Sequence, residues 1–221
     1  MAGCLVALLA LLIICNLAFV SSHGWGRLIW SLAGYLGLFA VCAVAQLRFA
    51  DIGLSRQNFP SGLRFAAYVI LAIVLVFAAI LLVDHGAFKD PRYDQSLPKA
   101  LDASLVLLPL KTVFFEELAF RGIFLALLTK LKAGRWLANI TSSVAFGLWH
   151  IGSTSGIGSY KLSAGVSVSQ SLIFGAVLLF TTVAGLLLCE LRWRSKSLLA
   201  PIAAHWFANC AGILIAAFSW R

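Results

Sequence analysis

Seven long apolar runs, separated by short polar and basic stretches, divide the chain. They cover residues 4–20, 28–47, 65–83, 101–129, 136–151, 170–190 and 197–219. An α-helix needs roughly 20 apolar residues to cross a hydrocarbon core about 30 Å thick, and most of the runs approach that length. None of them alternates apolar and polar residues as a barrel strand does. Because backbone groups in lipid need partners within their own segment, the pattern predicts an all-α fold: a polytopic transmembrane helix bundle of about seven spans.

The composition agrees with a membrane protein. Of 221 residues, 62% are hydrophobic and 11% are charged, which excludes an ordinary water-soluble domain. The net charge of +9 would suit nucleic acid, but the basic residues form short clusters between the apolar runs. Membrane topology accounts for such clusters, so the lipid bilayer is an expected partner and nucleic acid is not. The cysteines show no CxxC pair, so no disulfide framework is expected.

The distribution of Lys and Arg predicts the orientation. The second, fourth and sixth connections carry the larger share, namely Arg48, Arg56, Arg64, Lys130, Lys132, Arg135, Arg192, Arg194 and Lys196. The positive-inside rule places these connections and the N-terminus in the cytoplasm, and the cell membrane is the expected location. The first run could be a secretory signal, but no Lys or Arg precedes it and it is long for such a segment, so a retained first helix is favoured.

The fourth run contains four charged residues: Lys111, Glu116, Glu117 and Arg121. A lipid-facing charge at mid-span costs about 2.5–3.5 kcal/mol, so these side chains are expected to face protein or water. Glu117 and Arg121 are four residues apart with the acid first, which suits an ion pair. Glu116 is rotated about 100° from Glu117 and has no basic residue at that spacing. A carboxylate buried in this way is suited to act as a general base or a metal ligand.

Two later runs contain histidines paired at helical spacing with another notable residue. Phe146 and His150 bound the segment FGLWH, and His205 and Asn209 bound HWFAN. At 1.5 Å of rise per residue from the nearest basic anchor, Glu116, His150 and Asn209 lie at about 20–22 Å and His205 at about 14 Å. Similar depths allow these side chains to converge in one cavity inside the bundle.

The segments EELAFR, FGLWH and HWFAN, in this order, resemble the EExxxR, FxxxH and HxxxN motifs of the CPBP family. That family comprises CAAX proteases and bacteriocin-processing proteins, is also called Abi, and is described as intramembrane metalloproteases. The resemblance covers roughly residues 100–218. It divides the chain into N-terminal transmembrane helices at 1–99, with about three spans, and a CAAX-protease-like transmembrane domain at 100–221.

The resemblance implies a catalytic role for residues of all three motifs. Glu116 would act with His150 to activate a water molecule for attack on the scissile amide. His205 and Asn209 would stabilise the tetrahedral oxyanion. A base in such a reaction needs a pKa near the working pH, and one oxyanion donor typically lowers the barrier by a few kcal/mol.

The resemblance implies that Glu117 and Arg121 hold the helix and orient Glu116, and it leaves the role of a metal open. Glu116, His150 and His205 could supply three ligands to Zn²⁺ with water in the fourth position. The alternative is a metal-free mechanism that uses Glu116 and His150 directly. The sequence contains no HExxH pair, so a metal would have to bridge three helices.

Two functions from different classes follow. The first is an intramembrane endopeptidase of the CPBP type that hydrolyses a peptide bond of a membrane-associated or lipidated substrate with a Glu/His-activated water. The alternative is a non-catalytic membrane immunity or scaffold protein that binds a peptide in the same cavity. A transporter is disfavoured because the chain shows no inverted repeat. The Gly- and Ser-rich segment 152–170 is interpreted as either a flexible outer loop or a re-entrant lid.

Overall fold

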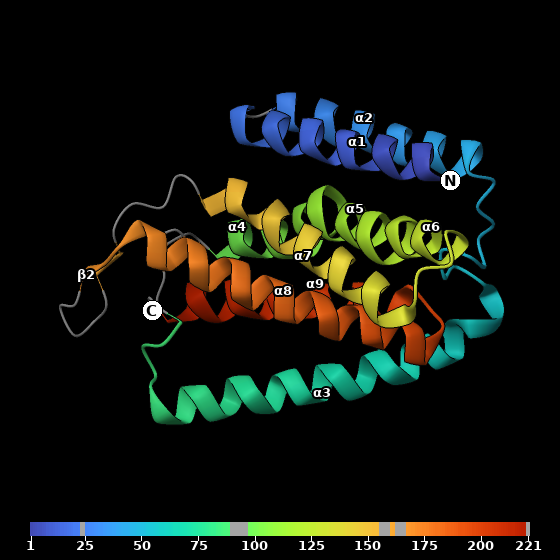
Figure 1. The fold of residues 1–221 in the computed structure, drawn as a ribbon. Coiled ribbons are helices and arrows are strands. Elements are labelled where there is room, and N and C mark those ends of the chain that lie inside the picture. Colours follow the sequence, from blue (N-terminus) through green and yellow to red (C-terminus); the bar gives the residue numbers. More distant parts are fainter. Residues whose placement is uncertain (23–24, 89–96, 155–159, 162–166, 220–221) are drawn as a thin grey trace. The chain divides into compact units, whose positions relative to one another are not determined.

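The computed structural model describes residues 1–22, 25–88, 97–154, 160–161 and 167–219, and nearly all of these residues are helical (Figure 1). The long helices are α1 (Ala2–Ser21), α2 (Trp25–Val44), α3 (Phe59–Val83), α7 (Arg135–Thr154), α8 (Gln170–Ser195) and α9 (Leu199–Phe218). A short 3₁₀ turn, η1 (Arg56–Asn58), precedes α3. Each of the seven apolar runs is therefore a helix, and the predicted all-α fold is confirmed.

The fourth run is helical throughout but changes its hydrogen-bond register several times. It consists of α4 (Leu97–Asp102), η3 (Ala103–Leu107), η4 (Pro109–Val113), α5 (Phe114–Glu117), η5 (Leu118–Phe124) and α6 (Leu125–Lys130). The three η segments are π-helical. Pro109 has no backbone N–H to donate and begins one of them, which is a local reason for a break in the regular ladder. π-helical turns often mark functional sites, and here they flank the two glutamates.

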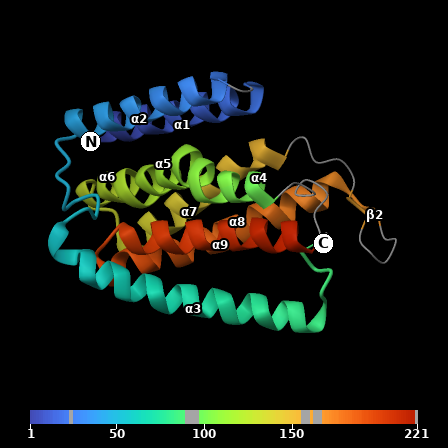
Figure 2. The same cartoon turned by 180° about the vertical axis from the view of Figure 1, so that it is seen from behind.

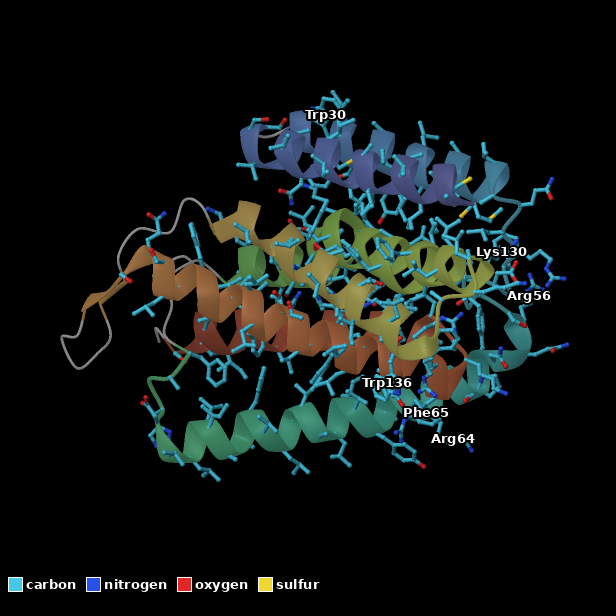
Figure 3. All side chains as sticks on the ribbon, viewed as in Figure 1. Trp30, Arg56, Arg64, Phe65, Lys130 and Trp136 are labelled. Atoms are coloured by element: carbon cyan, nitrogen blue, oxygen red, sulfur yellow. The ribbon has the colours of Figure 1, made fainter. Side chains whose placement is uncertain are left out.

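Four helices are long and apolar enough to cross a membrane: Ala2–Ser21, Arg56–Val83, Gln170–Ser195 and Leu199–Phe218. The helical segment Leu28–Val44 is also apolar but shorter. The protein is therefore an integral membrane protein. Near the N-terminal end of α3, Arg64 and Phe65 lie side by side (Figure 3). Basic and aromatic side chains are common at the membrane-surface ends of such helices.

A pairing of two short strands lies between α7 and α8. Strands β1 (Tyr160–Lys161) and β2 (Ser167–Val168) are antiparallel, with Tyr160 opposite Val168. They fall within segment 152–170, which the sequence left as either a loop or a lid. Residues 155–159 and 162–166 of that segment lie outside the described residues, so both interpretations stay predictions.

The chain forms two compact units, each of which takes residues from several parts of the sequence. Unit 1 is Met1–Ile52 with Leu118–Glu190, and unit 2 is Gly53–Glu117 with Leu191–Arg221. The units are spatial clusters, and the predicted division of the sequence at residue 100 stays a prediction.

In unit 1, α1 packs against α2 and α7. Small residues let helices approach closely: a Cβ added to Gly185 of α8 would lie 3.1 Å from the Cα of Ser143 on α7. The hydroxyl of the buried Ser142 donates to the carbonyl of Phe120 over 2.9 Å, which connects α7 to η5. At the end of α6, Lys130 donates to the carbonyl of Gln46 over 3.1 Å and so places a positive charge at the C-terminus of α2.

In unit 2, α3 lies beside α9, which also contacts α4, η3, η4 and α5 (Figure 2). The backbone N–H of Leu198 donates to the carbonyl of Gly53 over 2.8 Å, ahead of the first turn of α9. Further along α9, the indole N–H of Trp206 donates to the carbonyl of Ser104 over 2.9 Å. Trp206 is half-buried, and because an indole N–H inside a helix bundle needs a partner, this bond helps to fix the register of α9 against the fourth run. The register brings His205 to the two glutamates of α5.

Candidate active site

Both glutamates of α5 face the imidazole of His205. Glu117 Oε1 lies 2.7 Å from Nδ1 of His205, and Glu116 Oε2 lies 3.8 Å from Nε2. The side chains of Glu116 and His205 are 8% and 9% exposed, and that of Glu117 is fully buried. All three residues belong to unit 2. Two carboxylates and one imidazole therefore form a compact buried cluster.

Local helix geometry explains how neighbouring glutamates reach one ring. Successive side chains of an α-helix point about 100° apart, and the two nitrogens of an imidazole lie on different edges of the ring. Glu116 and Glu117 can therefore approach His205 from two sides. The four-residue helix that carries them, α5, follows directly on the π-helical η4, and both segments contact α9.

The hydrogen bond between Glu117 and His205 fixes a tautomer. An ionised carboxylate can only accept a hydrogen bond, so Nδ1 of His205 carries the proton. In the neutral ring, Nε2 then holds the lone pair and faces Glu116. A carboxylate that orients a histidine in this way recurs in hydrolytic triads and behind metal-bound histidines. The 3.8 Å between Nε2 and Glu116 exceeds a direct hydrogen bond and lets both groups contact the same water molecule.

His150 has the same proton arrangement, set by a different partner. Its Nδ1 lies 2.8 Å from the backbone carbonyl of Phe146, which can only accept, so Nδ1 donates and Nε2 holds the lone pair of the neutral ring. The rings of Phe146 and His150 meet edge to face, with centroids 4.4 Å apart. The guanidinium carbon of Arg121 lies 3.9 Å from the centroid of Phe146. In unit 1, Phe146 thus contacts both Arg121 and His150.

The structure brings the sequence-predicted residues together in two groups. Glu116, Glu117 and His205 meet in unit 2, and Arg121 and His150 meet through Phe146 in unit 1. Asn209 is exposed on α9, four residues after His205. The partnership of Glu116 with His150 stays a prediction.

The expected ion pair of Glu117 with Arg121 is likewise still a prediction. The structure describes an ion pair of Glu117 with His205 and a contact of Arg121 with Phe146. A regular α-helix places residues four apart on one face, but the π-helical η5 begins at Leu118, between the two residues.

The predicted zinc site stays a prediction. Among the residues that the structure describes, no three His, Cys, Asp or Glu side chains are arranged to hold a metal ion. Glu116 and His205 supply two donors in unit 2, while His150 belongs to unit 1.

Two residues that bond to the helices carrying the motif residues were not singled out from the sequence. Trp206 connects α9 to the carbonyl of Ser104, and Asn16 of α1 donates to the carbonyl of Trp149. A signal was present for Asn16, because it is the one amide side chain in an otherwise apolar run. Trp206 carried no comparable signal, since aromatic residues are common in membrane helices.

Comparison with known proteins identifies the family. A family model described as type II CAAX prenyl endopeptidase Rce1-like matches residues 100–211, just over half of the chain. No significant match was found among curated proteins or among solved structures. The matched residues include all the motif residues named above, and the resemblance to CAAX proteases is confirmed. The chain belongs to the Rce1-like type II CAAX prenyl endopeptidase family, a family of membrane proteases.

Proposed function

We propose that this protein is an intramembrane endopeptidase that hydrolyses a peptide bond of a membrane-associated or lipidated protein by means of a water molecule activated by glutamate and histidine. The observation that carries the proposal is the buried cluster in which Glu117 orients His205 and Nε2 of that ring faces Glu116. Ionisable side chains are costly to bury within membrane helices, and those found there commonly mark functional sites.

The first step of the proposed reaction is the activation of water. A water molecule between Glu116 and Nε2 of His205 gives one proton to the Glu116 carboxylate and is held through its second hydrogen by Nε2. Its oxygen attacks the scissile carbonyl carbon, and the carbonyl oxygen becomes an oxyanion. Glu117 keeps the proton of His205 on Nδ1, so that Nε2 stays available as an acceptor.

The second step is the collapse of the tetrahedral intermediate. The C–N bond breaks, and Glu116 returns its proton to the leaving nitrogen. By its family role, Asn209 donates to the oxyanion, and His150 assists in the activation of water. His205 can join Asn209 as an oxyanion donor only when Nε2 carries a proton, so the geometry favours His205 as the residue that holds the water.

The basic connections support the proposed orientation, with the N-terminus in the cytoplasm and the cell membrane as location. We propose the metal-free form of the reaction, in which Glu116 and His205 hold one water molecule between them. Substrate selection would then depend on a membrane-associated segment that presents its peptide bond to Glu116.

The test is cleavage of a pool of lipidated and unlipidated membrane-tethered peptides by the purified full-length protein. Glu116→Gln should reduce kcat by at least about 100-fold, since a general base contributes about 10²–10⁴-fold. Glu190→Gln is the matched control, because Glu190 pairs with Arg135 in unit 1 and lies outside the cluster. Cleavage that survives in Glu116→Gln would refute the mechanism.

A chelator arm and a cellular arm separate the remaining alternatives. Activity that a zinc chelator abolishes and added Zn²⁺ restores would replace the metal-free reaction by a metal-dependent one. Folded protein without any cleavage, together with a cellular phenotype that Glu116→Gln retains, would instead support the immunity or scaffold role.

A further inference from the structure

Asn16 of α1 makes a hydrogen bond to the helix that carries His150. Its Nδ2 donates to the backbone carbonyl of Trp149 over 2.7 Å. Trp149 directly precedes His150 near the C-terminal end of α7. Asn16 lies outside residues 100–211, which the family model matches, and both residues belong to unit 1. The bond therefore connects a helix outside the matched region to a residue of the FxxxH motif.

Two further contacts involve the same face of α1. Phe19, about one turn after Asn16, meets the ring of Trp149 edge to face, with centroids 6.0 Å apart. Gly152 of α7 has no room for a side chain, because a Cβ there would meet Oδ1 of Asn16 and lie 3.2 Å from Cγ2 of Val20. Asn16, Phe19 and Val20 of α1 thus pack against the last turns of α7. The absence of a side chain at Gly152 lets the two helices approach closely.

The position of these last turns decides where His150 points. Nδ1 of His150 is bonded to the carbonyl of Phe146, so the ring moves with the backbone of α7. Trp149 lies five residues before the last residue of α7, and helix ends fray unless something holds them. A hydrogen bond from a neighbouring helix restrains such an end, and an amide donor in an apolar helix has few other ways to be satisfied.

We infer that Asn16 is a positioning residue for His150, and that α1 is a retained part of the functional unit. Asn16 acts through the backbone at Trp149 and does not touch the reacting groups. The catalytic part of this inference rests on the proposed function, whereas the contact itself can be tested without any activity.

The catalytic test compares Asn16→Leu with Ser21→Ala in the full-length protein. Ser21 is the control because its hydroxyl bonds to carbonyls of α1 itself, those of Leu17 and Ala18. Asn16→Leu should lower kcat/KM by about 3- to 20-fold, as expected for one interhelical hydrogen bond in a membrane protein, whereas Ser21→Ala should change it less than about 2-fold.

Two readouts separate positioning from a general structural effect. In a His150→Ala background, Asn16→Leu should cause no further loss of activity, since effects that act through one residue are not additive. In Asn16→Asp, the protonated acid can donate to the Trp149 carbonyl and the ionised acid cannot, so activity relative to the wild type should rise as the pH falls. The inference would be overturned if the losses of activity were additive and if the activity of Asn16→Asp relative to the wild type did not change with pH.

The contact is tested independently by a thermal double-mutant cycle with Asn16→Ala and Gly152→Ala. Each single variant should lower the melting temperature. The double variant should lose less than the sum, because Asn16→Ala removes the atom that the new Cβ would meet. Additive losses in melting temperature would overturn the inference whether or not cleavage is seen. An active protein whose mass shows that residues 1–21 have been removed would also overturn it. A coupled cycle in a protein that cleaves nothing would refute the proposed function alone.

Discussion

Glu117 Oε1 and Nδ1 of His205 lie 2.7 Å apart, in a contact between residues 88 positions apart in the sequence. The carboxylate is fully buried, and the bond determines which ring nitrogen carries the proton. In the proposed reaction Glu117 therefore acts through His205, and its predicted ion pair with Arg121 stays a prediction. The bond gives the adjacent acids in EELAFR different roles, because Glu116 faces the proposed water and Glu117 sets the histidine that holds it.

Replacing Glu117 by Gln should separate these roles. The amide keeps the size of the side chain but loses its charge and can present N–H to the ring, which allows the other tautomer of His205. We expect kcat to fall at least about 100-fold, because a histidine in the wrong tautomer loses most of its catalytic contribution. KM should change little, since the substrate need not touch Glu117. Steady-state kinetics with a melting curve on the same sample measures both, and kcat within about 3-fold of wild type would contradict the assignment.

The contacts of Phe146 predict an energetic coupling in unit 1. The guanidinium of Arg121 lies over the Phe146 ring, and the edge of that ring meets His150. A desolvated cation–π pair contributes about 0.5–2 kcal/mol. A double-mutant cycle with Arg121→Met and Phe146→Leu should therefore give a coupling of that size in the free energy of unfolding. Phe120→Leu, which removes the other ring packed against Phe146 but no charge, serves as a comparison.

The same variants should also differ in kcat/KM if Phe146 orients His150. Phe146→Leu is expected to reduce kcat/KM more than its loss of stability accounts for, while Arg121→Met alone should have the smaller effect. The measurement is cleavage at a temperature where all variants remain folded. Equal activities in the two single variants would argue that the ring serves packing only.

The helices and most of the candidate residues could be predicted from the sequence because both follow from the cost of burying polar groups. Apolar runs of membrane length gave all seven helices, and charged or imidazole side chains inside them marked Glu116, Glu117, Arg121, His150 and His205. What could not be predicted depends on hydrogen-bond register. Periodicity arguments assume 3.6 residues per turn, and nothing in the composition of EELAFR signals that a π-helical segment begins at Leu118.

Contacts between different helices also could not be predicted from the sequence. The bonds of His205 with Glu117 and of Asn16 with Trp149 join residues 88 and 133 positions apart. Spacing within one helix cannot indicate such pairs. The depth argument placed His205 about one turn from the level of Glu116. The choice of partner depends on the rotation of α9, which the bond between Trp206 and Ser104 helps to fix.

Trp206→Phe should test the contribution of that bond. The substitution keeps an aromatic ring and removes the N–H that donates to Ser104. Interhelical hydrogen bonds in membrane proteins contribute about 0.6 kcal/mol on average and up to about 1.7 kcal/mol, so the loss of stability should be small. The activity should fall by about 3- to 10-fold, because α9 also carries His205 and a misplaced ring should raise the activation free energy by roughly the energy of the lost bond. Trp136→Phe is the control, because Trp136 on α7 is 70% exposed, and equal activity in both variants would contradict the prediction.

The connection between α2 and α3 should give the protein a dependence on acid pH. Burial alone would raise the pKa of Asp51, but hydrogen bonds from the backbone N–H and guanidinium of Arg48, together with the charges of Arg48 and Lys130, outweigh it and hold that pKa below its usual value. A carboxyl whose pKa is lower in the folded state stabilises that state fully above its unfolded pKa of about 3.9, and the contribution disappears as the pH falls through the folded value. The size should be below about 1 kcal/mol, because Arg48 is largely exposed. Melting temperatures between about pH 3 and pH 7 should therefore fall more steeply for the wild type than for Asp51→Asn, and parallel curves would show that Asp51 contributes nothing.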